Sequence, residues 1–199
     1  GVTAVSARDF LVAYNVNLNS TSTRRANAIA FDVREKGRKK REGASLLSPV
    51  VKDANGNDVW EPGSLKCVKG IGWFIEEYGI AQISYNLTNI SITSMHEAFY
   101  ETTLSATKRG LRVTGSELVG LVPLQAMLDA ADFYLKKQQR SLGISEKEKI
   151  KIAIKSLGLD DLKPFNPQER IIEYVMNAAA DKKLIDFTVA DFAEETASE

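Results

Sequence analysis

Residues 65–92 read LKCVKGIGWFIEEYGIAQISYNLTNISI, and this stretch decides the predicted fold. Along Ile80 to Ile92 apolar and polar residues alternate, as they do in a strand with one face in the core. A second strand is predicted over Leu65 to Glu76, and Tyr78-Gly79 between the two is typical of a hairpin turn. The centre of the sequence therefore predicts two neighbouring antiparallel strands.

Elements on both sides of this hairpin complete the pattern. On its N-terminal side, Phe10 to Leu18 alternates like a strand, and a helix is predicted from Ser20 to about Lys36. On its C-terminal side, a capping box beginning at Ser94 starts a helix that Gly110 stops, and Arg112 to Val119 reads as a fourth strand. This order is that of the ferredoxin-like βαββαβ fold, an antiparallel sheet with both helices on one face. The predicted fold class is therefore α+β.

The remainder of the chain is predicted to be helical. Capping or N-terminal residues signal helix starts at Pro123, Ser145, Asn166 and Thr188. The helix that starts at Asn166 is expected to run on through Met176, and the one at Thr188 is acidic. Residues 38–64 show little periodicity and several turn residues, which predicts a long and partly mobile loop.

The composition is that of an ordinary soluble chain. Its 199 residues fit one large domain or two small ones, and 44% hydrophobic residues suffice for a core. No apolar run reaches the roughly 18 to 20 residues of a membrane span. The lone Cys67 excludes an internal disulfide framework, which favours a reducing, cytoplasmic setting. Because the chain begins with Gly1 and a strand follows soon after, it is expected to be part of a longer protein.

The formal net charge is zero, but the charges are unevenly distributed along the chain. Between Arg34 and Glu42 there are six basic residues and two acids, a net of +4, whereas Asp181 to Glu199 holds two basic residues and six acids, a net of −4. The run Arg38 to Arg41 either attracts an anionic partner or is a solvated loop. No pattern of aromatic and basic residues indicates a nucleic-acid partner.

One predicted sheet face carries amides and hydroxyls. If the helices cover the apolar side, the opposite side presents Asn15, Asn17, Gln82, Ser84, Asn86 and Thr88. Such groups can bind a polar ligand or a partner domain, and they can equally form a plain solvent face. Solvent faces usually favour Lys and Glu, and the six predicted residues are uncharged.

His96 is the one histidine of the chain. In the first turn of its helix it lies near the positive end of the helix dipole, which should lower its pKa and keep the imidazole neutral. The neutral ring can hydrogen-bond a ligand, or it can complete local hydrogen bonds. Without further His or Cys clusters, no metal site is predicted.

Six stretches together resemble the C-terminal subdomain of glutamate formimidoyltransferase, over residues 1 to about 177. They read ARDFLVAYNVNL (7–18), VKGIGW (68–73), AQISYNL (81–87), TSMH (93–96), GSELVGLVPL (115–124) and PFNPQERIIEY (164–174). Residues 184–192, LIDFTVADF, resemble the opening helix of a formimidoyltetrahydrofolate cyclodeaminase domain. Residues 44–64 have no counterpart in the family pattern and look like an insertion within the loop 38–64.

The resemblance implies a division of the chain and an activity. Residues 1–140 would form the subdomain, 141–180 a helical extension, and 181–199 the acidic start of a cyclodeaminase domain. The implied reaction transfers a formimidoyl group between N-formimidoyl-L-glutamate and tetrahydrofolate, the co-substrate, in histidine degradation. The general-base His of the family belongs to an N-terminal subdomain that is missing here. No catalytic residue is therefore assigned, and the chain alone is predicted to be inactive.

The resemblance also implies partners and binding residues. Besides the missing subdomain and the cyclodeaminase domain, a homo-oligomer is expected, and no nucleic acid or membrane partner. Folate- or substrate-binding roles are expected for residues on the matching stretches: Arg8, Asn15, Asn17, Asn86 and His96. Arg8 would pair with a carboxylate, and the amides would fix the pterin or the glutamate moiety. The alternative is a non-catalytic ferredoxin-like module for folate capture or assembly.

Overall fold

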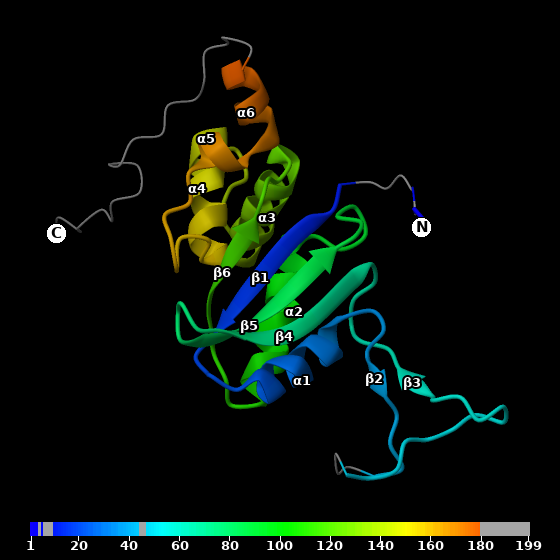
Figure 1. Cartoon of the computed structure of the whole chain (residues 1–199). Helices are drawn as coiled ribbons and strands as arrows, with labels where there is room; N and C mark the ends of the chain where they lie inside the picture. The colour runs from blue at the N-terminus through cyan, green and yellow to red at the C-terminus, as the bar shows by residue number, and fades with distance from the viewer. Residues whose placement is uncertain (4, 6–9, 44–46, 180–199) are drawn as a thin grey trace.

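The computed structural model describes residues 1–3, 5, 10–43 and 47–179, and it confirms the α+β class (Figure 1). Its main sheet is antiparallel, with the strand order β4-β5-β1-β6. That order, with two interposed helices, is the ferredoxin-like topology. The elements are β1 (Val12–Leu18), α1 (Thr23–Val33), β4 (Val68–Ile75), β5 (Ile80–Leu87), α2 (Met95–Lys108) and β6 (Val113–Val119). Each lies within the range that the sequence predicted.

The helices α1 and α2 pack on the apolar face of the sheet, where the core lies. Tyr14 and Tyr85 are fully buried there, and the Tyr85 hydroxyl lies 2.9 Å from that of Thr102 on α2. Two glycines of β4 make this close packing possible. A Cβ atom on Gly70 would lie 2.6 Å from the Tyr85 ring, and one on Gly72 would lie 2.3 Å from the Asn27 backbone nitrogen. The missing side chains let α1 approach the strand directly.

The outer edge of β4 is covered by side chains of α1. The Asn27 amide donates to the Gly72 carbonyl at 3.0 Å and accepts from the Gly72 N–H at 3.0 Å. The Arg34 guanidinium donates to the Gly70 carbonyl at 3.1 Å. Because an unpaired strand edge can pair with other chains, these bonds close the sheet on that side.

Helices α3 (Leu124–Lys137) and α4 (Glu146–Leu157) follow beside β6, as Figure 1 shows. The capping box at Ser145 begins α4 as predicted, and Gly158, in the left-handed conformation, ends it. Pro123 differs from the prediction: it is the residue before α3 and has an extended conformation, not the first helical position. The predicted acidic helix at Thr188 lies outside the described residues.

The helix predicted from Asn166 is in fact two, α5 (Pro167–Arg170) and α6 (Ile172–Ala179). Ile171 between them is extended and fully buried, and it forms a parallel bridge with Val122. The Val122 N–H donates to the Arg170 carbonyl at 2.9 Å, and the Ile172 N–H donates to the Val122 carbonyl at 3.0 Å. Pairing with a distant segment therefore interrupts the local helical preference.

The segment predicted as a mobile loop contains a small hairpin. Strands β2 (Arg38–Lys39) and β3 (Trp60–Glu61) pair antiparallel, and further bridges join Arg41 with Val50 and Lys52 with Asp58. This β2–β3 hairpin projects from the body of the domain at the end opposite α6 (Figure 1). Turn residues alone predicted a loop because the pairing partners are about 20 positions apart in the sequence.

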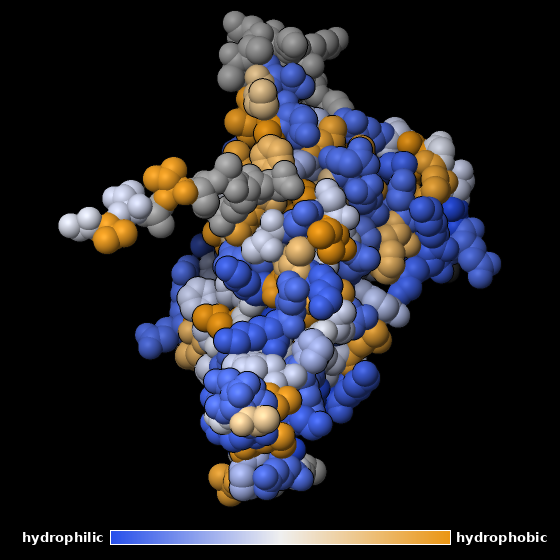
Figure 2. Space-filling model, turned by 90° about the vertical axis from the view of Figure 1, so that its right-hand side faces the viewer, coloured by the Kyte–Doolittle hydropathy of each residue, from blue (hydrophilic) through white to orange (hydrophobic). Residues whose placement is uncertain are grey.

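The face of the molecule drawn in Figure 2 carries hydrophobic residues in small patches. On the face shown in Figure 2, most of the area is hydrophilic and the hydrophobic residues are scattered. Among the described residues, no helix combines the length and the hydrophobicity that crossing a membrane requires.

Candidate functional site

The face of the sheet that points away from α1 and α2 is the candidate site, and we call it the open sheet face. Strand register and the alternation of side chains define its members. They are Ala13, Asn15 and Asn17 of β1, Lys69, Ile71 and Trp73 of β4, Gln82, Ser84 and Asn86 of β5, and Gly115, Glu117 and Val119 of β6. The predicted uncharged face therefore also contains one cation and one carboxylate.

A hydrogen-bonded network occupies the middle of this face. Glu117 accepts through one carboxylate oxygen from the Asn15 amide at 3.2 Å and from the Gln82 amide at 3.3 Å. The same Gln82 nitrogen donates to the Asn17 amide oxygen at 2.7 Å. All three amide residues are buried.

The segment after α4 closes one side of the network. Asp161 accepts from the Asn17 amide at 2.9 Å and from the Thr114 hydroxyl at 3.1 Å. Gly115 permits this approach, since a Cβ atom there would lie 2.3 Å from the Asp161 Cβ. The helical extension is thus joined to the sheet by a charged residue of the site itself.

The network leaves one buried acceptor without a partner among the described residues. The Gln82 side-chain oxygen is inaccessible and accepts no hydrogen bond there. An unpaired buried acceptor costs free energy, and because this oxygen is inaccessible, a ligand on the open sheet face does not reach it in the described conformation.

Exposed apolar side chains lie on the β4 and β6 margins of the face. Trp73 is 42% exposed, Ile71 56% and Val119 50%. Lys69 and Asn86, which pair across β4 and β5, are exposed beside them. An aromatic ring, a cation, the exposed Asn86 amide and a carboxylate on one surface suit a flat ligand with hydrogen-bonding edges and a carboxylate.

The structure brings together three of the five predicted binding residues. Asn15, Asn17 and Asn86 share the open sheet face, although Asn15 and Asn17 are buried and bonded to acids instead of free. Arg8 lies outside the described residues. Thr88 of the predicted polar face lies beyond β5, and its hydroxyl donates to the Cys67 carbonyl at 2.9 Å.

His96 lies on the other side of the sheet, between α2 and α3. Its ring stacks against Phe133 with 4.7 Å between centroids, and its Nε2 lies 3.0 Å from the Ser94 hydroxyl. Burial lowers its pKa, with nearby Glu97 and Asp129 opposing that effect. The neutral imidazole that the helix dipole predicted is thus favoured, and desolvation is the main physical cause. Its position separates it from the three asparagines.

Sequence reasoning missed Glu117, Asp161, Lys69 and Trp73 as members of the site. Glu117 and Trp73 stand at alternate positions of predicted strands, so the phase of each strand relative to its neighbour could have found them. Asp161 follows a helix, and nothing in its local sequence indicates a contact with a strand 144 positions earlier.

Comparison with known proteins gives consistent matches. The family model described as the formiminotransferase domain matches residues 13–177. The chain is 46% identical to the formimidoyltransferase-cyclodeaminase of Gallus gallus over 183 residues, which cover 92% of this chain and 30% of that protein. It is 41% identical to the Mus musculus protein of that name, over 98% of this chain and 32% of the relative.

A relative with a different name matches a shorter part. The glutamate formimidoyltransferase of Thermoplasma acidophilum is 35% identical over 135 residues, 68% of this chain and 36% of that protein. The chain therefore spans about a third of the length of these curated relatives.

Proposed function

The chain belongs to the formiminotransferase domain family, and on that premise we propose that it is the folate-binding half of a glutamate formimidoyltransferase. The observation that carries this proposal is the open sheet face, where a buried network of amides and carboxylates is flanked by an exposed tryptophan and a lysine. Folate is a flat heterocycle with hydrogen-bonding edges and a glutamate tail, which matches those groups in kind.

Each part of the face has a proposed task. Trp73 offers a ring against which the pterin can stack. The exposed Asn86 amide binds the polar edge of the heterocycle. Lys69 attracts a carboxylate of folate or of formimidoylglutamate. These contacts would orient the two substrates, and orientation alone can lower a bimolecular barrier by several kcal/mol.

The proposed reaction also requires a proton transfer. A nitrogen of tetrahydrofolate attacks the formimidoyl carbon and forms a C–N bond, while the C–N bond to glutamate breaks. A proton leaves the folate nitrogen, and one is taken up by the glutamate nitrogen. A group with a pKa near 7 suits this task. His96 lies away from the open sheet face, so we propose that the base comes from the region preceding this chain, which would form the opposite wall of the cleft.

The names of the relatives support further parts of the proposal. Formimidoyltransferase-cyclodeaminases are named for two activities, and the chain covers about a third of them, which supports a longer protein with a cyclodeaminase domain. We propose a role in histidine degradation, in the cytoplasm and in a homo-oligomer, as the family resemblance implies.

A transfer assay tests the proposal. Tetrahydrofolate-dependent consumption of formimidoylglutamate should be at background for this chain and present in a protein that also carries the preceding region, at equal molar concentration. Activity of the chain alone within about tenfold of the extended protein would contradict the need for a second half. Folate binding without transfer by the extended protein would favour the folate-capture alternative.

A further inference from the structure

A concave surface lies on the helical side of the sheet, between α1, the β2–β3 hairpin and the end of α2. It encloses about 1040 Å³, and we call it the basic groove. Seven cationic side chains and one acid, Glu61, line it. The cations are Arg24, Arg25, Arg34, Arg38, Lys39, Arg41 and Arg109. The sheet separates this groove from the open sheet face, because α1 and α2 cover the opposite side.

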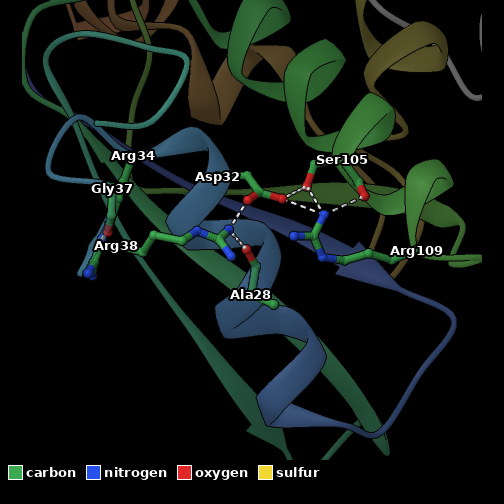
Figure 3. Close-up of polar contacts among 7 residues, drawn as sticks. All are labelled: Ala28, Asp32, Arg34, Gly37, Arg38, Ser105 and Arg109. Atoms are coloured by element: carbon green, nitrogen blue, oxygen red, sulfur yellow. Dashed lines mark hydrogen bonds and ion pairs between the residues drawn. The ribbon is translucent and has the colours of Figure 1, made fainter. Parts of the chain in front are cut away.

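Two of the arginines share one carboxylate, as Figure 3 shows. Arg38 from β2 and Arg109 from the end of α2 converge on Asp32 of α1, and the Ser105 hydroxyl donates to the same carboxylate at 2.6 Å. The side chains of Arg38 and Arg109 are 32% and 28% exposed. Burial lowers the pKa of both, and for Arg38 the neighbouring Arg109 adds to this effect. The single negative charge of Asp32 therefore balances only one of the two guanidinium charges.

Two further arginines lie at the N-terminal end of α1, where the helix dipole disfavours a positive charge. Arg24 and Arg25 occupy the first turn of α1, which contains no acidic residue. The dipole makes this end positive, so anions are stabilising there and cations are not. Neither side chain forms an ion pair within the described residues. The free energy of α1 thus includes an electrostatic cost that a bound anion would offset.

The other cations differ in how far they are neutralised. Lys39 pairs with Asp58 at 2.6 Å, but Lys52 pairs with the same carboxylate, so Lys39 is only partly neutralised. Arg34 lies 4.0 Å above the Phe31 ring and donates only to backbone carbonyls. Arg41 donates to the Ser48 carbonyl at 2.6 Å. In the described structure, neither of these two arginines has an acidic partner. The unpaired charge of the groove is therefore carried mainly by guanidinium groups.

We propose that the basic groove binds a small molecule carrying several phosphate groups, at a site separate from the folate site. Guanidinium forks match phosphate oxygens with two parallel hydrogen bonds, and each bond to an ionised group is stronger than a neutral one. A phosphate ester carries a charge of about −1.5 to −2 near neutral pH, more than a carboxylate. The concentration of unpaired arginines in one concavity favours the more highly charged group, and the volume admits several such groups together.

The chain offers a reporter for this site. It contains two tryptophans, of which Trp60 lines the basic groove and Trp73 lies on the open sheet face. In a Trp73→Phe background, the fluorescence comes from Trp60. Titration with inorganic tripolyphosphate should change this fluorescence with saturation at one equivalent per chain. Added salt should weaken the binding, because exposed charges are screened over about 8 to 10 Å at physiological ionic strength.

Charge-matched variants separate a specific site from general attraction. Arg24→Gln combined with Arg25→Gln should weaken tripolyphosphate binding at least about tenfold, since each removes a charged hydrogen-bond donor. Glutamine keeps the helical preference of α1, and circular dichroism checks the fold. Lys136→Gln combined with Arg140→Gln removes the same charge near the end of α3 and should change the affinity by less than about twofold. Arg41→Gln, on the hairpin side, should weaken binding by about two- to tenfold.

Three results would overturn the proposal. They are the absence of saturable tripolyphosphate binding, an equal loss of affinity in the two double variants, and binding of an oligoglutamate peptide of equal charge as tight as that of tripolyphosphate. Tetrahydrofolate takes no part in these titrations, so their outcome is independent of the proposed transferase function.

Discussion

For the asparagines of β1, the sequence predicted the correct face of the sheet but not the hydrogen-bond partners of their side chains. Alternation predicted that Asn15 and Asn17 share a face, and the register confirms it. Their amides are bonded to Glu117 and Asp161, which are 102 and 144 positions away in the sequence. Periodicity is a local signal, so it predicts the direction of a side chain but not the partner that a distant segment supplies. We therefore propose that the exposed residues of this face, Asn86 and Trp73, carry the ligand-binding roles.

The burial of His96 leads to a prediction about how the free energy of unfolding depends on pH. Burial lowers its folded-state pKa below the value of about 6.5 for an unfolded histidine. As the pH falls through 6.5, the unfolded chain takes up a proton that the folded chain does not, so the free energy of unfolding decreases. We expect the wild-type chain to lose stability from about pH 7 to about pH 5.5, where few other side chains titrate.

His96→Phe supplies the comparison. The ring can still stack on Phe133, and the titrating group is gone. Urea unfolding at a series of pH values should show a flatter pH dependence for this variant than for the wild type. Equal slopes in both proteins would mean that the burial of His96 does not control stability in this range, and that other groups do.

The packing of α1 against β4 depends on Gly72, and the loss of unfolding free energy in a Gly72→Ala variant measures this dependence. In Gly72→Ala the new Cβ atom would lie 2.3 Å from the Asn27 backbone, so the helix or the strand must move. The two Asn27–Gly72 hydrogen bonds would weaken as well. We expect a loss of about 3 kcal/mol or more in the free energy of unfolding.

Gly56 is the matched control. It has a positive φ of 82°, and nothing lies within 4 Å of where its Cβ would be. Gly56→Ala should cost only the backbone strain, about 1 to 2 kcal/mol. Urea denaturation of both variants measures the difference, and similar losses would show that the close approach of α1 is not what Gly72 provides.

Elements that rest on neighbouring residues were predicted well. The capping boxes at Ser94 and Ser145 need only residues within one helical turn, and both are present. The break at Ile171 and the pairing of β2 with β3 were not predicted, because both depend on segments that meet only after folding. Local sequence preferences predicted α4 correctly. The same kind of preference favoured a continuous helix across Ile171 and a loop in place of the β2–β3 hairpin.

At the scale of the molecule, the sheet divides two surfaces of different chemistry. The order of elements and the alternation along β1, β4 and β5 were sufficient for the fold class. They also predicted which face the helices cover, but not the basic groove, whose arginines come from α1, β2, the following loop and the end of α2. A groove built from separate elements leaves only a weak trace in the sequence, here the basic run from Arg38 to Arg41.

Because the sheet edges are covered and the core is shared, we expect residues 10–43 and 47–179 to fold as one unit. β4 is bonded to α1, and β6 is bonded to the segment after α4 through the Ser116 N–H and the Gly158 carbonyl at 2.8 Å. In a Trp60→Phe variant, Trp73 fluorescence reports the sheet and far-ultraviolet circular dichroism the helices. We expect the two urea transitions to coincide. Separate midpoints would show that the helical extension unfolds independently of the sheet.

The central claim is that the open sheet face forms one wall of the folate site. It is tested most directly by the dissociation constant of monoglutamyl tetrahydrofolate, measured by calorimetry on a protein that carries this chain and the region preceding it. Trp73→Ala removes the proposed stacking ring, and Trp60→Ala removes the other tryptophan, on the far side of the sheet. Loss of stacking on an aromatic side chain costs about 1 to 3 kcal/mol, so Trp73→Ala should weaken binding about five- to a hundredfold, while Trp60→Ala leaves it within about twofold of the wild type. An unchanged dissociation constant in a folded Trp73→Ala protein, or an equal loss in both variants, would contradict the placement of folate on this face.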